Sequence, residues 1–251
     1  MKTHMSIRCM VAAVSVFAAI GSTHADVSER VGYAYDTQTG AFLYSETHRE
    51  VMENNRLVTN TVSYRDADGR VFAEKYINFQ RSLTMPDFHL VDSDNGHVES
   101  ARGSEAQLNV QFRQLSDTDV REASVETPQN GIIDAGFDRF IEQHWDALVA
   151  GGVIEREFLI PSQLDFYTFE VVRTKSEQLD GYAFELRIKS MFLQMFVEPV
   201  LVHYDSQRRT LLRYEGISNI RDREGQNFDV RIEFRSSTRV QVELNSEIPS
   251  T

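Results

Sequence analysis

The chain has 251 residues, 41% of them hydrophobic, and its 26 basic and 38 acidic residues give a formal net charge of −12 at pH 7. This length suits one domain, or one domain with an elaboration, and is ample for a sizeable core. The negative charge repels nucleic acid and anionic membrane surfaces, so we expect no nucleic-acid partner.

The amino terminus has the three parts of a secretory signal peptide. Lys2 and Arg8 supply the positive region, and the apolar run that follows, residues 9–20, is too short to span a bilayer. Residues 23–25, Thr-His-Ala, then place small side chains at the −3 and −1 positions of a cleavage site. We therefore expect residues 1–25 to be a signal peptide that is cleaved.

Cleavage near Ala25 would leave a mature chain that begins at Asp26. The single cysteine, Cys9, would be removed, so an oxidising compartment is compatible but no disulfide is expected. A lipoprotein would carry its cysteine where Asp26 stands, and no later stretch reaches the roughly 20 apolar residues of a transmembrane helix. We therefore expect residues 26–251 to form a single β-rich domain in the periplasm, with no lipid anchor and no transmembrane segment.

Alternating apolar and polar residues between short turn sequences predict a meander through the first half of the chain. The turns at residues 66–69 and 92–96 are rich in Asp, Asn and Gly, which make side-chain turn bonds and tolerate positive φ. The expected strands cover residues 30–37, 41–51, 57–65, 70–79, 88–91, 107–115 and 120–126.

A helical period interrupts the strands in the middle of the chain. Charged residues lie opposite its apolar ones, which predicts an amphipathic helix from about Asp134 to Ala150. Asp134 is a candidate N-cap, and Gly151 with Gly152 would end the helix. The apolar positions are Ile133, Phe137, Phe140, Ile141, Trp145, Leu148 and Val149.

Alternation is clearest in the second half, at residues 182–189, 228–235 and 239–244. Apolar side chains alternate there with charged ones, which predicts strands with one buried and one wet face. The charged faces could form a binding surface, although cross-strand charge pairing is their ordinary purpose. We therefore predict a mainly β protein, a long antiparallel meander forming a curved sheet or half-open barrel with one amphipathic helix packed on it.

Two stretches of the second half have an unusual composition. Residues 191–197 concentrate methionine and phenylalanine, which adapt to irregular apolar ligands and could line a cavity or its mouth. The alternative is a buried strand or turn of the core. Residues 211–220 join an alternating strand to a glycine and a Ser-Asn pair, which favours a structural bend over a polar site.

The sequence lacks the motifs of common catalytic sites. It has no Gly-x-Ser-x-Gly elbow, no His-Glu-x-x-His helix, no phosphate-binding glycine loop and no paired cysteines. His144, beside Trp145 on the expected helix, could act as a base, but the sequence places no partner for it. We therefore expect no enzyme, no catalytic residues, no metal and no cofactor.

The export signal, the meander, the single helix and the hairpin at residues 204–209, which leads into 211–216, together carry a family resemblance. The chain resembles uncharacterised bacterial periplasmic proteins whose architecture is similar to that of the LolA/LolB-type lipoprotein carriers. The resemblance covers roughly residues 30–245 and is architectural. It implies a half-open β-barrel covered by helices around an apolar cavity.

This resemblance favours a non-enzymatic periplasmic binding or carrier protein for a lipid or other apolar ligand. The alternative is a cell-envelope interaction or assembly protein, with a filled β scaffold whose loops or sheet edge meet an envelope protein. A hydrolase with an unrecognised site ranks third. An open apolar volume inside the fold would favour the first hypothesis. The expected lining residues are Phe137, Phe140, Trp145, Met191, Phe192, Met195 and Phe196.

Overall fold

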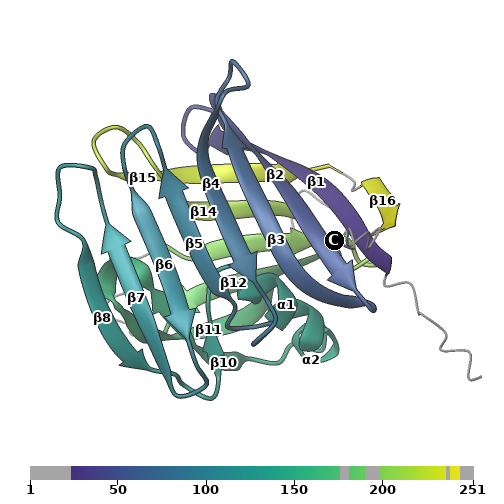
Figure 1. The fold of residues 1–251 in the computed structure, drawn as a ribbon. Helices are drawn as coiled ribbons and strands as arrows, with labels where there is room; N and C mark the ends of the chain where they lie inside the picture. Colours follow the sequence, from purple (N-terminus) through teal and green to yellow (C-terminus); the bar gives the residue numbers. More distant parts are fainter. Residues whose placement is uncertain (1–23, 176–180, 190–197, 236–237, 244–251) are drawn as a thin grey trace, which may run out of the picture.

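The computed structural model describes residues 24–175, 181–189, 198–235 and 238–243, which form a mainly antiparallel β protein with two short helices (Figure 1). The predicted β class and curved sheet are confirmed. The strands of the first half are β1 (His24–Asp36), β2 (Phe42–Glu53), β3 (Arg56–Arg65), β4 (Val71–Asn78), β5 (Asp87–Asp92), β6 (Val98–Gly103), β7 (Gln107–Arg113) and β8 (Arg121–Glu126).

The second half begins with β9 (Gly131–Ile132) and the helices α1 (Gly136–Gln143) and α2 (Trp145–Val149). A 3-10 turn, η1 (Pro161–Gln163), joins the next two strands. The remaining strands are β10 (Ile154–Ile160), β11 (Asp165–Thr174), β12 (Tyr182–Ile188), β13 (Val200–Tyr204), β14 (Leu211–Arg221), β15 (Asn227–Phe234) and β16 (Thr238–Glu243).

The long strand β1 joins the two halves into one sheet. One side of β1 pairs with β2 along its length, and the other side pairs with β15 and then β16, with Gly32 opposite Phe234 and Val27 opposite Val240. From β1 the chain zigzags out to β8 at one edge, crosses through β9 and the helices, and zigzags back from β10 to β15. The sheet order is therefore β8 to β1 and then β15 to β9.

The sheet curves until distant parts of its two halves touch. Asn95, in the β5–β6 turn, donates a hydrogen bond from Nδ2 to the carbonyl of Arg221 at 3.3 Å, and Arg121 of β8 donates one to the carbonyl of Ser162 in η1 at 2.7 Å. Register shifts in β1, β2, β3, β13 and β14 supply bends of the kind that β-bulges produce. The two halves thus lie across from each other in the molecule (Figure 1).

Gly32 allows close packing at the join between the halves. A Cβ at this position would lie 2.8 Å from side-chain carbons of both Ile232 and Phe234. Only glycine therefore leaves room for these β15 side chains on the inner face of β1.

The helical region differs from the prediction at two places. The expected single helix from Asp134 to Ala150 is two helices, because the backbone at His144 leaves helical geometry, with φ −109° and ψ 13°. Asp134 has a left-handed φ of 44° and does not cap α1, since its carboxylate binds side chains of the sheet. The predicted end is confirmed, as Gly151 has φ 90° and its N–H donates to the carbonyl of Leu148.

Five strands have no counterpart among the predicted ones: β6, β9, β10, β11 and β13. In β6 the inward positions are Glu99 and Ala101, so no apolar alternation marks the strand. Strand β9 has only two residues and pairs in parallel with β10. Periodicity fails where a strand's inner face is polar or where the strand is too short to show a period.

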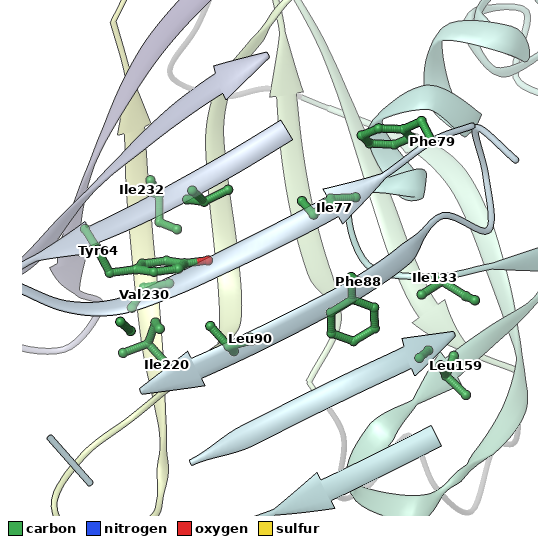
Figure 2. Packing of buried hydrophobic residues seen from close by; sticks show 14 of the residues in the cluster. Tyr64, Ile77, Phe79, Phe88, Leu90, Ile133, Leu159, Ile220, Val230 and Ile232 are labelled. Atoms are coloured by element: carbon green, nitrogen blue, oxygen red, sulfur yellow. The ribbon is translucent and has the colours of Figure 1, made fainter. Parts of the chain in front are cut away.

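Two apolar clusters form the core. The first joins strands of both halves, and Figure 2 shows Tyr64, Ile77 and Leu90 in the same packing as Ile220 and Ile232. The second packs α1 and α2 against β11, β12 and β13. In it the single tryptophan, Trp145, is 4% exposed and meets the rings of Tyr182, Phe184 and Tyr204 edge-on at 5.6 to 5.8 Å.

Replacing Trp145 by Ala should lower the free energy of unfolding by about 3–5 kcal/mol, because the indole leaves a cavity in the second cluster. Urea unfolding followed by circular dichroism measures this loss. The control is Asp146→Ala, next in the chain, whose side chain is 89% exposed and which should leave stability nearly unchanged. Equal stability of the two variants would contradict the packing of α2 on the sheet.

Candidate functional site

A cavity of about 710 Å³ lies between the two halves of the sheet, a size typical of small-molecule pockets. Strands β1 to β6 line one side, β10 to β15 line the other, and the chain entering α1 adds residues 133–135 and 137–139 to the lining. The lining extends from Ile77, 1% exposed, to Ile217, 46% exposed, so the cavity reaches from the core to the surface.

The second half contributes an apolar wall. Its inward side chains come from alternate positions of successive strands, so that Phe169 of β11 lies opposite Ile188 of β12, and Tyr214 of β14 lies opposite Ile232 of β15. The apolar wall consists of Phe158, Phe169, Leu186, Ile188, Val200, Val202, Tyr214, Ile232 and Phe234.

The first half contributes a polar wall. Strand register places one residue of each strand from β1 to β6 in a single row across the sheet. The row is Arg30, His48, Val62, Lys75, Leu90 and Glu99. Neighbouring rows add further polar side chains among apolar ones such as Ile77. The polar wall consists of Arg30, Glu46, His48, Glu50, Asn60, Lys75 and Glu99.

A buried ion pair ties the polar wall to the start of α1. Lys75 Nζ lies 2.8 Å from Asp134 Oδ1, and the two side chains are only 7% and 14% exposed. Asn219 of β14 donates from Nδ2 to the same oxygen at 3.0 Å. Although burial opposes both charges, the Asp134 carboxylate raises the pKa of Lys75, and Lys75 with Asn219 lowers the pKa of Asp134.

A hydrogen-bonded chain runs along β2 and β3. His48 Nε2 lies 2.9 Å from Glu46 Oε1, and Asn60 Nδ2 lies 3.3 Å from His48 Nδ1. With a neutral imidazole, Asn60 donates to His48 and His48 donates to Glu46. Asn60 is 3% exposed, and its Oδ1 has no hydrogen-bond partner among the described residues. The chain therefore ends in a buried acceptor that is not used.

A second charged network links α1 to both halves. Tyr204 of β13 donates to Asp138 Oδ1 at 2.6 Å, and Arg139 lies 2.8 Å from the other oxygen of Asp138 and 3.7 Å from Glu50 of β2. Burial and the adjacent Asp138 raise the pKa of Tyr204 well above its usual range. Burial opposes the charge on Arg139, but Asp138, Glu142 and Glu50 raise its pKa. Tyr204 thus stays neutral and Arg139 stays charged at neutral pH.

A third polar contact joins the halves at the far end of the polar wall. Arg221 of β14 lies 3.9 Å from Glu99 of β6, and Glu99 also lies 3.3 Å from the ring of His97. Burial lowers the pKa of Arg221, and Glu99 counters this. The guanidinium also stacks over Phe112 at 5.1 Å. Charge and ring contacts therefore hold the two halves together beside the cavity.

The predicted lining residues occupy three kinds of place. Phe137, Phe140 and Trp145 all belong to the cluster between the helices and β11 to β13, and of these three only Phe137 also lines the cavity. The reason is that the helices turn Phe140 and Trp145 toward the sheet, where Phe140 is fully buried and its ring lies 6.3 Å from that of Phe137. Met191, Phe192, Met195 and Phe196 lie outside the described residues.

Two strands of the polar wall carry a charged residue among their buried apolar positions. In β4 the inward positions are Ala73, Lys75 and Ile77, so a lysine occupies a position whose neighbours two residues away are buried and apolar. In β2, Glu46 likewise lies two residues after the buried Tyr44, on the same face of the strand. A charged residue on the apolar parity of a strand indicates a buried partner or a ligand.

His144 is not a free base, because both its ring nitrogens are engaged. Nδ1 lies 3.0 Å from the carbonyl of Phe140, and Nε2 lies 2.9 Å from a guanidinium nitrogen of Arg156. Within the described part of the chain, no three His, Cys, Asp or Glu residues are grouped as metal ligands would be. None of the described helices has the length and apolar character needed to cross a membrane.

Comparisons with known proteins show a likeness to a solved structure and no family. No family model matches the chain, and no curated protein matches it. A solved structure that is similar is the crystal structure of a β-barrel-like protein of the domain of unknown function DUF1849 from Brucella abortus. The match has 11% sequence identity and a TM-score of 0.35, and covers 86% of this chain and 97% of that chain. Such a match bears on neither ligand nor activity, and the resemblance to LolA/LolB-type carriers stays a prediction.

The Lys75–Asp134 pair gives a test of the polar wall. Lys75→Met should lower the free energy of unfolding by about 3–5 kcal/mol, since it leaves a buried carboxylate without its cation. Adding Asp134→Asn should restore part of this loss, because the unpaired charge is then gone. Urea unfolding of the single and double variants measures both effects.

The matched control is Lys189→Met, which breaks an ion pair of similar length, 2.6 Å to Glu155, whose two side chains are each 49% exposed. This change should have little effect, as is usual for surface pairs. A Lys75 variant as stable as the Lys189 variant would contradict the burial of the pair.

Proposed function

We propose that this protein is a non-enzymatic binding or carrier protein for a lipid or other largely apolar ligand, held in the cavity between the two halves of the sheet. The observation that carries the proposal is the cavity of about 710 Å³, which remains although both core clusters are packed around it. A filled scaffold would leave no such volume. The cavity therefore supports ligand binding over the envelope-assembly alternative.

The apolar wall supplies the driving force. Each 100 Å² of apolar ligand surface that leaves water contributes about 2.5 kcal/mol before the costs of association. The exposed Ile217 at one end of the lining gives such a ligand a way in, and the deepest positions, such as Val202 at 1% exposed, give it a dry contact.

Two further observations weigh on the competing functions. Strand β8 lies at one end of the sheet order and carries Arg121, Glu122 and Glu126, and charges of this kind discourage the addition of a partner strand. The candidate base His144 is held by the Phe140 carbonyl and Arg156. The charges on β8 therefore weigh against assembly through this edge strand, and the contacts of His144 weigh against its use as a base in hydrolysis.

Binding can be tested with the neutral fluorescent probe N-phenyl-1-naphthylamine. Wild-type protein should bind it, and Val200→Trp should weaken binding by at least about tenfold, or about 1.4 kcal/mol, because the indole fills cavity space beside the apolar wall. Probe titration measures the affinity, and circular dichroism confirms folding.

The matched control is Val153→Trp, at a position that is 60% exposed and away from the cavity. It should bind the probe as the wild type does. Loss of binding in both variants, or no binding by the wild type, would contradict the proposed function.

We also propose that the protein acts in the periplasm after removal of residues 1–25. The full-length chain, expressed in a Gram-negative host, should appear in the osmotic-shock fraction with Asp26 as its first residue, as amino-terminal sequencing would show. Replacing Ala25 by a bulky residue such as Leu should block processing. Recovery of an uncleaved wild-type chain in the cytoplasm would contradict this localisation.

A further inference from the structure

We infer that the cavity selects a ligand with an apolar body and a hydrogen-bond-donating polar group that carries no negative charge, a hydroxyl or an ammonium, and disfavours a carboxylate. This inference rests on the proposed function and adds the chemical class of the ligand to it. Three observations on the polar wall lead to it.

The first observation is the unused acceptor on β3. Asn60 is 3% exposed, lines the cavity, and uses Nδ2 on His48 while its Oδ1 has no partner among the described residues. A buried polar atom without a partner costs free energy, which a ligand can recover by supplying a donor. A hydroxyl or ammonium supplies that donor, whereas an ionised carboxylate has only acceptors.

The second observation is the direction of the hydrogen bonds behind that acceptor. His48 bridges Asn60 to Glu46, whose side chain is 9% exposed, so the chain leads back to a buried carboxylate. With a neutral imidazole that carries its proton on Nε2, Asn60 donates to His48 and His48 donates to Glu46. The polarity of this chain therefore favours a donor at its Asn60 end and opposes an anion there.

The third observation is the charge around the cavity. The basic lining residues Lys75, Arg139 and Arg221 each lie within 4 Å of a carboxylate. Arg30 stacks on Phe234 at 4.5 Å, and against the effect of burial it adds to Arg139 in lowering the pKa of Asp138. A carboxylate ligand would have to compete for these partners. The acidic members of the lining are Glu46, Glu50, Glu99, Asp134, Asp138 and Glu198.

The two walls together orient such a ligand. The acceptor at Asn60 belongs to the first half of the sheet, and the apolar wall belongs to the second half across the cavity. A ligand whose donor meets Asn60 therefore directs its apolar body toward side chains such as Phe169 and Leu186. A purely apolar ligand has no donor for this acceptor, so the polar atoms of the wall would stay without a partner from the ligand.

A set of three ligands with one chain length tests the inference. Dodecylamine, 1-dodecanol and dodecanoate are titrated against bound N-phenyl-1-naphthylamine on the wild-type protein at pH 7 and below their micellar concentrations. The amine and the alcohol should displace the probe at concentrations at least about tenfold lower than dodecanoate does. This comparison needs no variant and so does not depend on variant folding.

Two variants locate the effect. Asn60→Leu should remove the advantage of both the amine and the alcohol over dodecanoate, with each ligand measured against the probe bound to the same variant. The control Asn109→Leu, on the exposed face of β7, should keep this advantage. Glu46→Gln should reduce the advantage of the amine alone, and its control is Glu74→Gln on the exposed face of β4.

The outcomes separate this inference from the function on which it rests. Equal displacement by all three ligands, or stronger displacement by dodecanoate, would overturn the selectivity and leave apolar binding intact. An advantage that survives Asn60→Leu would overturn the role of this amide. Absence of probe binding by the wild type would overturn both proposals.

Discussion

The buried ion pair between Lys75 and Asp134 is the constraint around which the interior is arranged. It joins β4 of the first half to the residue that precedes α1, and Asn219 adds β14 of the second half to the same carboxylate. A buried charge is tolerated only when it is paired and hydrogen-bonded, so these three segments must meet at one point. The left-handed backbone of Asp134 is kept by these contacts, and they set where α1 begins.

The cavity exists because the two halves of the meander differ in the residues they turn inward. The second half presents apolar side chains, which pack against the helices in one place and leave a free surface in another. The first half presents ionic and amide groups that are tied to one another across strands, so they cannot collapse onto the apolar wall without leaving their partners. Polar networks of this kind, when their members are satisfied, rigidify the surface that carries them.

Much of the fold followed from the sequence, and the reasons for success and failure are physical. Strands with one wet face, such as β12 and β15, show their period directly, and the glycine after α2 marked a helix end. The break at His144 could not be seen, because the apolar period continues across it and the arginine of β10 that contacts the ring comes from another part of the chain. The helix face predicted Phe137, Phe140 and Trp145 as a group, but only three-dimensional packing separates the cavity wall from the core. Single positions such as Lys75 indicate a buried charge, but the polar wall as a whole could not be predicted because its members come from five strands that the chain joins only by folding.

The position of β1 has a consequence for how the protein is made. This strand is translated first, yet its second neighbour, β15, comes near the end of the described chain, with Gly32 opposite Phe234. The join can close only when almost the whole polypeptide is present, which gives the fold many contacts between distant residues and predicts slow folding. Until then one long edge of β1 has open backbone groups, and edges of this kind recruit other strands. A chaperone that covers unpaired strands would therefore act mainly in the interval between the emergence of β1 and the arrival of β15.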